Sequence, residues 1–190
     1  MLAAFPARAV FLQRGTITRL RHSPLSSPPM KIGSMESQDL LKLFRALNTE
    51  GVEYVVVGAV AMALHGLLRY TDDADLFVRP TLENFERLRA ALRSAWDDPS
   101  IDEIAVDERS GEFYAIAYVP PDGELSMDFL PRLGEAFRYE DIESHLVPFM
   151  GVKVPVATPA ALWEMKHATA RAQDRLDAST LNDKFDLGKE

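Results

Sequence analysis

The segment that most constrains the fold is Asp73-Ala74-Asp75-Leu76-Phe77-Val78, in which acidic and apolar residues alternate before an apolar run. Side chains of a strand alternate between its two faces, so a strand here places Asp73 and Asp75 on the same face. Ala74 and Leu76 then lie on the other face. Two carboxylates about 7 Å apart on one face are able to share a hard divalent cation or a pair of cations.

The acid pair by itself has little weight, because a chain with 15 Asp among 190 residues contains about one such pair by chance. A solvated strand end therefore remains an open alternative. A later acid, Asp128, interrupts the otherwise apolar segment 125–130. If that segment is a strand beside the Asp73 strand, three carboxylates converge at one edge of a sheet. Like charges brought together are costly unless a cation lies among them.

Charge is unevenly distributed along the chain. Residues 1–34 carry five Lys and Arg and no acid, so residues 35–190 hold 16 basic against 29 acidic side chains, a balance of −13. This balance argues against a broad, sequence-independent nucleic-acid binder, although a small basic docking patch is compatible with it. The absence of Cys excludes disulfides and thiolate metal sites and is compatible with the cytoplasm, where we expect the protein. The nearly uncharged run 54–68 is too short for a membrane span, so we expect no membrane partner.

The first 34 residues differ from the rest in composition, with four of the twelve prolines and several serines. Three interpretations are open: a disordered tail, a transit-like segment, or sequence translated upstream of a start at Met30 or Met35. We favour the last, because helical patterning begins just after Met35. Residues 35–190 are expected to form a single domain.

Periodicity and turn residues predict an α/β (α+β) fold with a mixed sheet flanked by helices. Internal repeats, a Walker-type phosphate loop and the dinucleotide glycine fingerprint are absent. The expected helices lie at about 37–50, 59–65, 82–95, 139–144 and 159–176, and the expected strands at 52–57, 74–78, 101–106, 112–119, 124–130 and 152–156.

The ordered combination of segments 55–61, 64–66 and 69–76, followed by a lone acid in a later strand, resembles the minimal nucleotidyltransferases of the DNA polymerase β-like superfamily. Within that superfamily the chain is most similar to the AbiEii/MenT-like proteins associated with toxin–antitoxin systems. The ending 158–177 is similar to the C-terminal helix of that group, and the likeness covers about 37–181. The resemblance implies a nucleotidyltransferase fold.

The resemblance also implies roles for the acids. Asp73 and Asp75 match the metal-binding acid pair of the family, and the implied ions are Mg²⁺ or Mn²⁺. Asp128 matches the third carboxylate, which helps to hold metal and draws a proton from the attacking group.

The implied nucleotide-binding residues are Gly58, Arg69 and Lys166. Gly58 matches the glycine that lets a nucleoside triphosphate approach the backbone at a helix start. Lys166 matches the family lysine near the triphosphate, and Arg69 is a phosphate contact. Ala59 departs from the Gly-Gly or Gly-Ser usual in the family and removes one phosphate contact. Two alternatives that need no ligand stay open. In the first, Gly58 does no more than end a strand, and in the second, Lys166 lies on a solvated helix face.

The implied activity is transfer of a nucleoside monophosphate from a nucleoside triphosphate to an acceptor hydroxyl, with release of pyrophosphate. RNA is the acceptor class that the resemblance suggests. The main alternative is a catalytically silent protein of the same fold that binds a cognate antitoxin protein. A metal-dependent phosphohydrolase using the same three acids is a third hypothesis.

Overall fold

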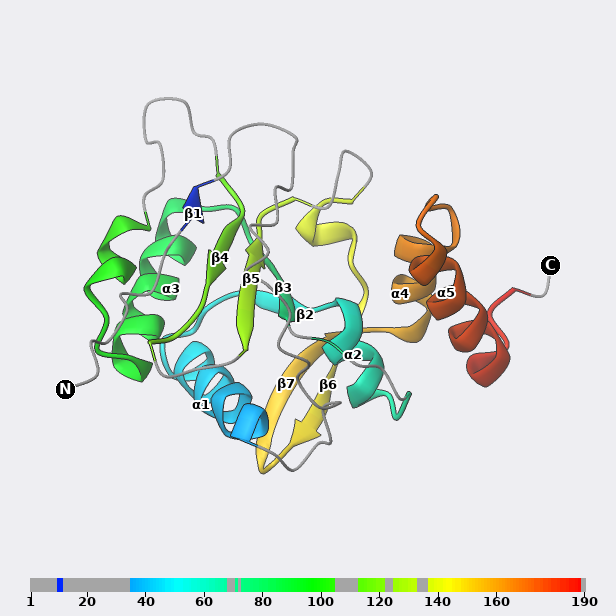
Figure 1. The fold of residues 1–190 in the computed structure, drawn as a ribbon, viewed down its shortest axis with the longest axis horizontal. Coiled ribbons are helices and arrows are strands. Elements are labelled where there is room, and N and C mark those ends of the chain that lie inside the picture. The colour runs from blue at the N-terminus through cyan, green and yellow to red at the C-terminus, as the bar shows by residue number, and fades with distance from the viewer. Residues whose placement is uncertain are drawn as a thin grey trace.

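The computed structural model describes residues 10–11, 35–67, 71, 73–104, 113–121, 125–132 and 137–188. Within them the strands form a seven-stranded mixed sheet in the order β1-β4-β5-β3-β2-β7-β6. Helices flank this sheet (Figure 1), so the predicted fold class is confirmed. The predicted phosphate contact Arg69 lies outside the described residues, as does most of the segment 1–34.

The strands are β1 (Val10–Phe11), β2 (Tyr54–Val56), β3 (Asp73–Val78), β4 (Ile116–Tyr118), β5 (Ser126–Leu130), β6 (Ser144–Phe149) and β7 (Val152–Ala157). The helices are α1 (Met35–Thr49), α2 (Gly58–Leu64), α3 (Leu82–Ala95), α4 (Pro159–His167) and α5 (Ala172–Phe185), with 3₁₀ helices η1 (Pro99–Glu103) and η2 (Tyr139–Asp141). No helix among the described residues is both long and apolar enough to cross a membrane.

The centre of the sheet is β3, which runs parallel to β5 and antiparallel to β2. Burial alternates along β3 and β5: Ala74, Leu76, Met127 and Phe129 are fully buried. The residues between them are only half-buried. This alternation is the period of a strand with one face on the core, and it confirms the face assignment made from the sequence.

Helix α3 begins where the sequence predicts. The Thr81 Oγ1 accepts a hydrogen bond of 3.2 Å from the Asn84 backbone N–H, which satisfies one of the free amides of the first turn. On the outer face Arg87 pairs with Glu83 one turn earlier. Helices α1 and α3 pack against each other and cover one side of the sheet (Figure 1).

Two predicted elements are wrong, and the helix predicted at 139–144 is only the short η2, with Ser144 already in β6. Residues 101–103 belong to η1 rather than to a strand, because Asp98 Oδ1 accepts from Ser100 N at 2.9 Å and Pro99 occupies the first position of the turn. The single helix predicted over 159–176 is two helices, since α4 ends at His167 and α5 begins at Ala172. Figure 1 shows the two as a hairpin at one end of the molecule.

The strand β6 was not predicted. It pairs antiparallel with β7 through a tight connection at Met150 and Gly151, which have φ of 46° and 83°. Positive φ at both central residues is typical of the type I′ hairpin turn. Because Met is rare in that conformation, no local sequence signal indicated the turn.

Candidate metal and nucleotide site

Four oxygen-bearing side chains lie at the corners of a rectangle on one face of β3 and β5. Asp73 faces Ser126 in the register of the two parallel strands, and Asp75 faces Asp128. All four residues are half-buried. Neighbouring strands are about 4.8 Å apart, and residues two apart on one strand are separated by about 6.6 Å. The strand pairing that the sequence could state only conditionally is therefore present, and it brings Asp75 and Asp128 side by side.

Two hydroxyl groups, one of them that of Ser126 itself, contact acids of this rectangle. The Thr71 Oγ1 lies 2.5 Å from Asp73 Oδ1 and 3.0 Å from the Asp73 backbone carbonyl oxygen, so these two acceptors share its one proton, and the Asp73 backbone N–H donates to Thr71 Oγ1 at 3.3 Å. The Ser126 hydroxyl donates to Asp128 Oδ1 at 3.3 Å. Neither hydroxyl was predicted as a site residue. The signal available was the spacing, because each hydroxyl stands two residues before an acid.

Gly58 begins α2 directly against the Asp75 carboxylate. Its φ is +64°, and a Cβ added to it would lie 2.1 Å from Asp75 Oδ2. The preceding Val57 N–H donates to the Asp75 carbonyl at 3.0 Å, which fixes this approach. Any side chain at position 58 would displace the carboxylate, so glycine is required here for the acid as well as for its backbone conformation.

The donor set suits a hard divalent cation. Mg²⁺ typically takes one or two protein carboxylates and completes its shell with waters and substrate phosphates, so the facing Asp75 and Asp128 fit it. Within the described segments, however, no three acidic or histidine side chains lie close enough to hold a metal ion as they stand. The predicted three-acid convergence is thus absent from these side-chain positions, in which Asp73 is hydrogen-bonded to Thr71. The metal roles of the three acids stay predictions.

Lys166 joins α4 to α5. Its Nζ lies 3.2 Å from Asp174 Oδ1 and 2.8 Å from Asp177 Oδ2. The side chains of Lys166 and Asp177 are only 12% and 3% exposed, so the alternative of a solvated helix face is wrong for this pair. Thr169 Oγ1 donates to Asp174 Oδ2 at 3.0 Å and completes the cluster. A contact between Lys166 and a triphosphate stays a prediction.

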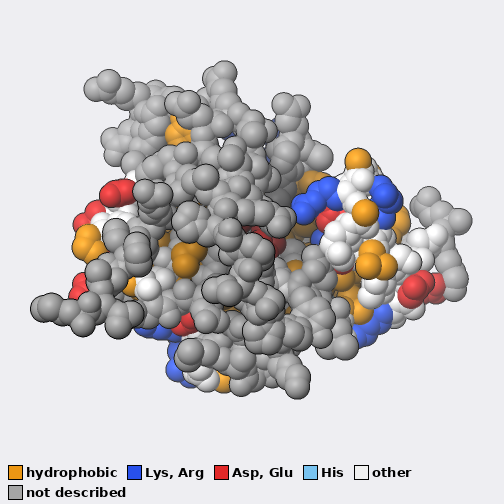
Figure 2. Space-filling view, viewed as in Figure 1, with side chains coloured by type: hydrophobic (Ala, Val, Ile, Leu, Met, Phe, Trp, Pro, Cys, Tyr) orange, Lys and Arg blue, Asp and Glu red, His pale blue; other side chains and the backbone are white. Residues whose placement is uncertain are grey.

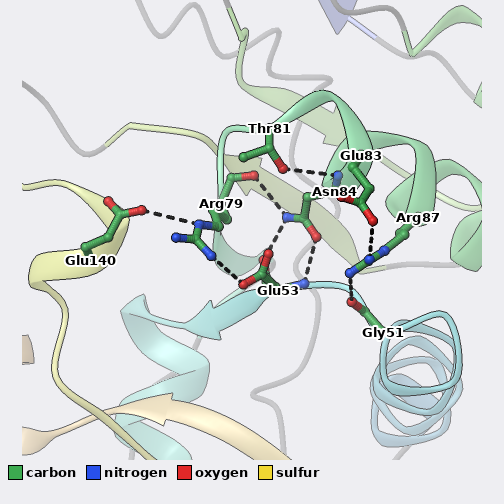
Figure 3. A network of polar contacts seen from close by, with 8 residues as sticks. All are labelled: Gly51, Glu53, Arg79, Thr81, Glu83, Asn84, Arg87 and Glu140. Atoms are coloured by element: carbon green, nitrogen blue, oxygen red, sulfur yellow. Dashed lines mark hydrogen bonds and ion pairs between the residues drawn. The ribbon is translucent and has the colours of Figure 1, made fainter.

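The far end of β3 carries a different polar group (Figure 3). Asn84, 1% exposed, donates through Nδ2 to the carbonyls of Glu53 and Arg79, both at 2.9 Å, and its Oδ1 accepts from Glu53 N at 2.7 Å. Arg79 forms ion pairs with Glu53 at 2.8 Å and with Glu140 at 3.3 Å. This network joins the chain before β2 to the start of α3.

His65 caps the other end of α2. Its Nε2–H donates to the Ala157 carbonyl at 2.8 Å, and its ring packs on those of His145 and Phe185. Burial is the largest cause that lowers the pKa of His65 below its usual value. These contacts describe a residue that anchors α2 rather than one that serves the carboxylates.

No family model and no curated protein matches the sequence. Solved structures do match. An antigenic nucleotidyltransferase-like protein from Paracoccidioides brasiliensis is 14% identical with a TM-score of 0.51, covering 80% of this chain and 77% of its own. ANT(2'')-Ia in complex with adenylyl-2''-tobramycin is 13% identical with a TM-score of 0.50, covering 80% and 90%. A candidate nucleotidyltransferase from Thermotoga maritima is 18% identical with a TM-score of 0.50, covering 78% and 91%. At these identities the likeness is one of fold, and the chain has the fold of the nucleotidyltransferases.

Proposed function

We propose that the protein is a metal-dependent nucleotidyltransferase that moves a nucleoside monophosphate from a nucleoside triphosphate to an acceptor hydroxyl. The observation that carries this proposal is the facing of Asp75 and Asp128 on neighbouring parallel strands, with Gly58 pressed against Asp75. The shared fold supports the same conclusion. The finer membership, in the AbiEii/MenT-like group, rests on the sequence resemblance alone.

In the proposed reaction the acceptor oxygen attacks the α-phosphorus and forms a new P–O bond. The bond from the α-phosphorus to the oxygen that bridges it to the β-phosphorus breaks, and pyrophosphate leaves with the bonding electrons. The Asp128 carboxylate takes the proton of the acceptor hydroxyl. Asp73, Asp75 and Asp128 would hold Mg²⁺ or Mn²⁺, which when bound supplies charge neutralisation for the triphosphate and acidifies the attacking hydroxyl. Lys166 would leave Asp174 and Asp177, contact the phosphates and offset part of the negative charge of the leaving pyrophosphate.

The activity is tested with purified protein, each of the four α-labelled nucleoside triphosphates, Mg²⁺ and a total cell extract. The proposal expects a labelled acceptor and pyrophosphate in equal amounts, both lost on chelation of the metal. Phosphate release without a labelled product would instead identify a phosphohydrolase. No product with any triphosphate would favour the silent binding protein, whose partner would be an antitoxin.

The proposed role of Lys166 in binding the triphosphate can be measured separately from its contribution to folding. Lys166→Met removes the ammonium group from the buried Asp177 and from Asp174, which keeps its 3.8 Å contact with Arg171, and should cost about 3–5 kcal/mol of unfolding free energy. Adding Asp177→Leu should restore much of that loss, because a buried ion pair replaced by apolar residues is often neutral in stability. If Lys166 contacts the triphosphate, this stable double variant still transfers poorly. Recovery of transfer would show that the lysine is only structural.

For the acceptor we propose RNA, on the resemblance. A small basic docking patch would have to come from arginines such as the pairs four residues apart on α3 and at the start of α5. Each of these four has a local partner: Arg89 pairs with Glu86, Arg93 with Asp102 and Arg171 with Asp174, and Arg175 donates to the Ala170 carbonyl. Figure 2 accordingly shows basic, acidic and apolar side chains interspersed over the α4–α5 hairpin.

Substituting Arg171 and Arg175 by Glu should reduce RNA labelling, more steeply as salt rises, while triphosphate binding survives. Unchanged RNA labelling by this variant would remove the α5 arginines from the interface. A labelled small molecule in place of RNA would overturn the RNA proposal. ANT(2'')-Ia, seen with adenylyl-2''-tobramycin, is a precedent of this fold for such an acceptor.

A further inference from the structure

We propose that His65 is a pH-dependent clasp, which holds both ends of the α4–α5 hairpin at neutral pH and loosens the end of α5 in acid. The inference goes beyond the proposed function and does not depend on it. His65 lies at the C-terminus of α2, and its contacts reach the residue before the α4 cap and the last turn of α5. The hairpin between these two ends carries Lys166.

The ring of His65 holds the start of the hairpin. Its Nε2–H donates to the Ala157 carbonyl at 2.8 Å, and Thr158, the next residue, caps α4 by accepting from the Ala161 N–H at 3.2 Å. Because a carbonyl oxygen can only accept, this contact assigns the proton of the neutral ring to Nε2. Nδ1 is then the nitrogen that takes up a proton when the ring becomes charged.

The end of the hairpin meets the same residue from another side. Lys184 Nζ donates to the backbone carbonyls of His65 and Gly66, both at 2.9 Å. A positive charge is favourable at the C-terminus of a helix, where the last carbonyl groups have no partner within the helix. The Phe185 ring lies edge-on to the His65 ring, with centroids 6.1 Å apart. The last turn of α5 is therefore joined to α2 by an ammonium group and a ring contact.

The groups around His65 disfavour a positive charge on its ring. Among the described residues, His145 of β6 faces it with ring centroids 5.2 Å apart, Lys184 faces it from α5, and the junction of β7 and α4 contributes a backbone carbonyl. Burial and then these two basic groups lower the pKa of His65, although the Ala157 hydrogen bond acts in the opposite direction. A proton on the ring therefore costs more while α5 is docked.

The direction of the pH effect follows from linkage. A basic group whose pKa is lowered in the docked state binds protons more readily in the open state, so a falling pH favours opening. The contact between α2 and α5 is fully stable above the ordinary His pKa of about 6.5 and weakens as pH falls below it. Reciprocally, a substitution that opens the contact raises the pKa of His65.

Amide hydrogen exchange followed by NMR measures the opening of the last turn. The Asp186 N–H donates to the Asn182 carbonyl at 2.7 Å and reports on the end of α5. The Trp96 N–H donates to the Leu92 carbonyl at 2.8 Å in the same position of α3 and is the internal reference. The intrinsic exchange rates of both amides change with pH by the same factor. The protection of Asp186 relative to Trp96 should fall severalfold from about pH 7.5 to about pH 5.5.

Three substitutions at histidines locate the proton. His65→Gln keeps an N–H donor near the position of Nε2 but takes up no proton, so its relative protection should be independent of pH. His145→Gln removes a facing group from β6 and should reduce the pH response, which decides the question if His65→Gln does not fold. His167→Gln is the matched control, because this ring stacks on Trp163 of α4, and it should respond like the wild type.

Lys184→Met tests the reciprocal effect. It removes the donor to two carbonyls of α2 and should lower the relative protection of Asp186 about tenfold at neutral pH, the usual effect of losing a hydrogen bond from a charged group. In the same variant the pKa of His65, followed through its ring NMR signals, should rise toward the ordinary value.

Three results would each overturn the inference: wild-type relative protection that is constant with pH, a pH response retained by His65→Gln, or an unchanged His65 titration in Lys184→Met. All three are measured without nucleotide or metal. Their outcome is therefore distinct from that of the labelling assay, which tests the proposed function.

Discussion

The two ends of β3 both carry polar residues, but they combine them in opposite ways. At its end, Arg79, Glu53 and Asn84 match donors with acceptors, and the buried Asn84 makes three hydrogen bonds to backbone groups. At its start, Asp75 faces Asp128 of the neighbouring strand and Asp73 lies on the same face, so this end carries acidic side chains only.

From this difference we expect two kinds of residue: those that stabilise the fold, and those whose placement lowers its stability and serves the proposed reaction. Complementary polar groups stabilise a buried contact, whereas neighbouring carboxylates repel one another to the extent that other groups leave their charge uncompensated. Substitutions at the end of β3 should therefore change stability and spare activity. Substitutions at its start should do the reverse.

The largest expected effect is that of Asp75→Asn, which should abolish nucleotide transfer. The melting temperature should stay the same or rise, because one of the gathered negative charges is removed. Calorimetry and the labelling assay measure the two quantities on one preparation. Asp102→Asn, at an exposed ion pair with Arg93, is the control and should leave transfer intact. Nucleotide transfer that persists in Asp75→Asn would contradict the assignment of activity to the start of β3 and of stability to its end.

Asn84→Leu should lower the free energy of unfolding by about 2–4 kcal/mol, because two carbonyls and one amide lose their partner. Urea unfolding measures the loss, and transfer per folded molecule should be unchanged. Thr81→Ala removes only the cap of the same helix and should cost about 1 kcal/mol. Equal losses in the two variants would mean that the Asn84 contacts contribute little.

Gly58→Ala compared with Gly51→Ala isolates the crowding at Asp75. Both glycines have nearly the same φ, +64° and +65°, but a Cβ at Gly51 has no atom within 4 Å. Both variants should lose about 1 kcal/mol from backbone strain. Only Gly58→Ala should lose about 1–2 kcal/mol more and also weaken Mn²⁺ binding. Identical stability and metal binding in the two variants would show that Asp75 tolerates a side chain at Gly58.

The smallest effect is expected for Arg79→Ala. The Arg79, Glu53 and Glu140 side chains are 38%, 41% and 57% exposed, so water screens both ion pairs. The loss of unfolding free energy should be smaller than that of Thr81→Ala and shrink further in high salt. Urea unfolding at two salt concentrations checks this. A loss of unfolding free energy as large as that of Asn84→Leu would mean that the ion pairs of Arg79, rather than the buried Asn84 amide, supply most of the stability of the network.

Much of this arrangement followed from local patterns. The alternation of Asp73 and Asp75 with Ala74 and Leu76 predicted a strand with one polar face, and the Thr81 cap predicted the start of α3. Both depend on interactions between residues a few positions apart, where side-chain period and hydrogen-bonding chemistry are readable in the sequence. The strand predicted at 101–106 failed for a local reason too, because the Asp98-Pro99 turn competes with a strand there.

By itself, then, the sequence determined which residues share a face of each element and where several elements begin. The tertiary structure alone decided that β5 lies beside β3, that Asp128 faces Asp75, and that Lys166 lies between two acids of α5. The physical reason is that strand neighbours and helix packing are chosen by the summed burial of surfaces distant in sequence. No local pattern encodes that sum. From the sequence alone, the position of Asp128 beside Asp75 could therefore be stated only on the condition that the two strands are neighbours.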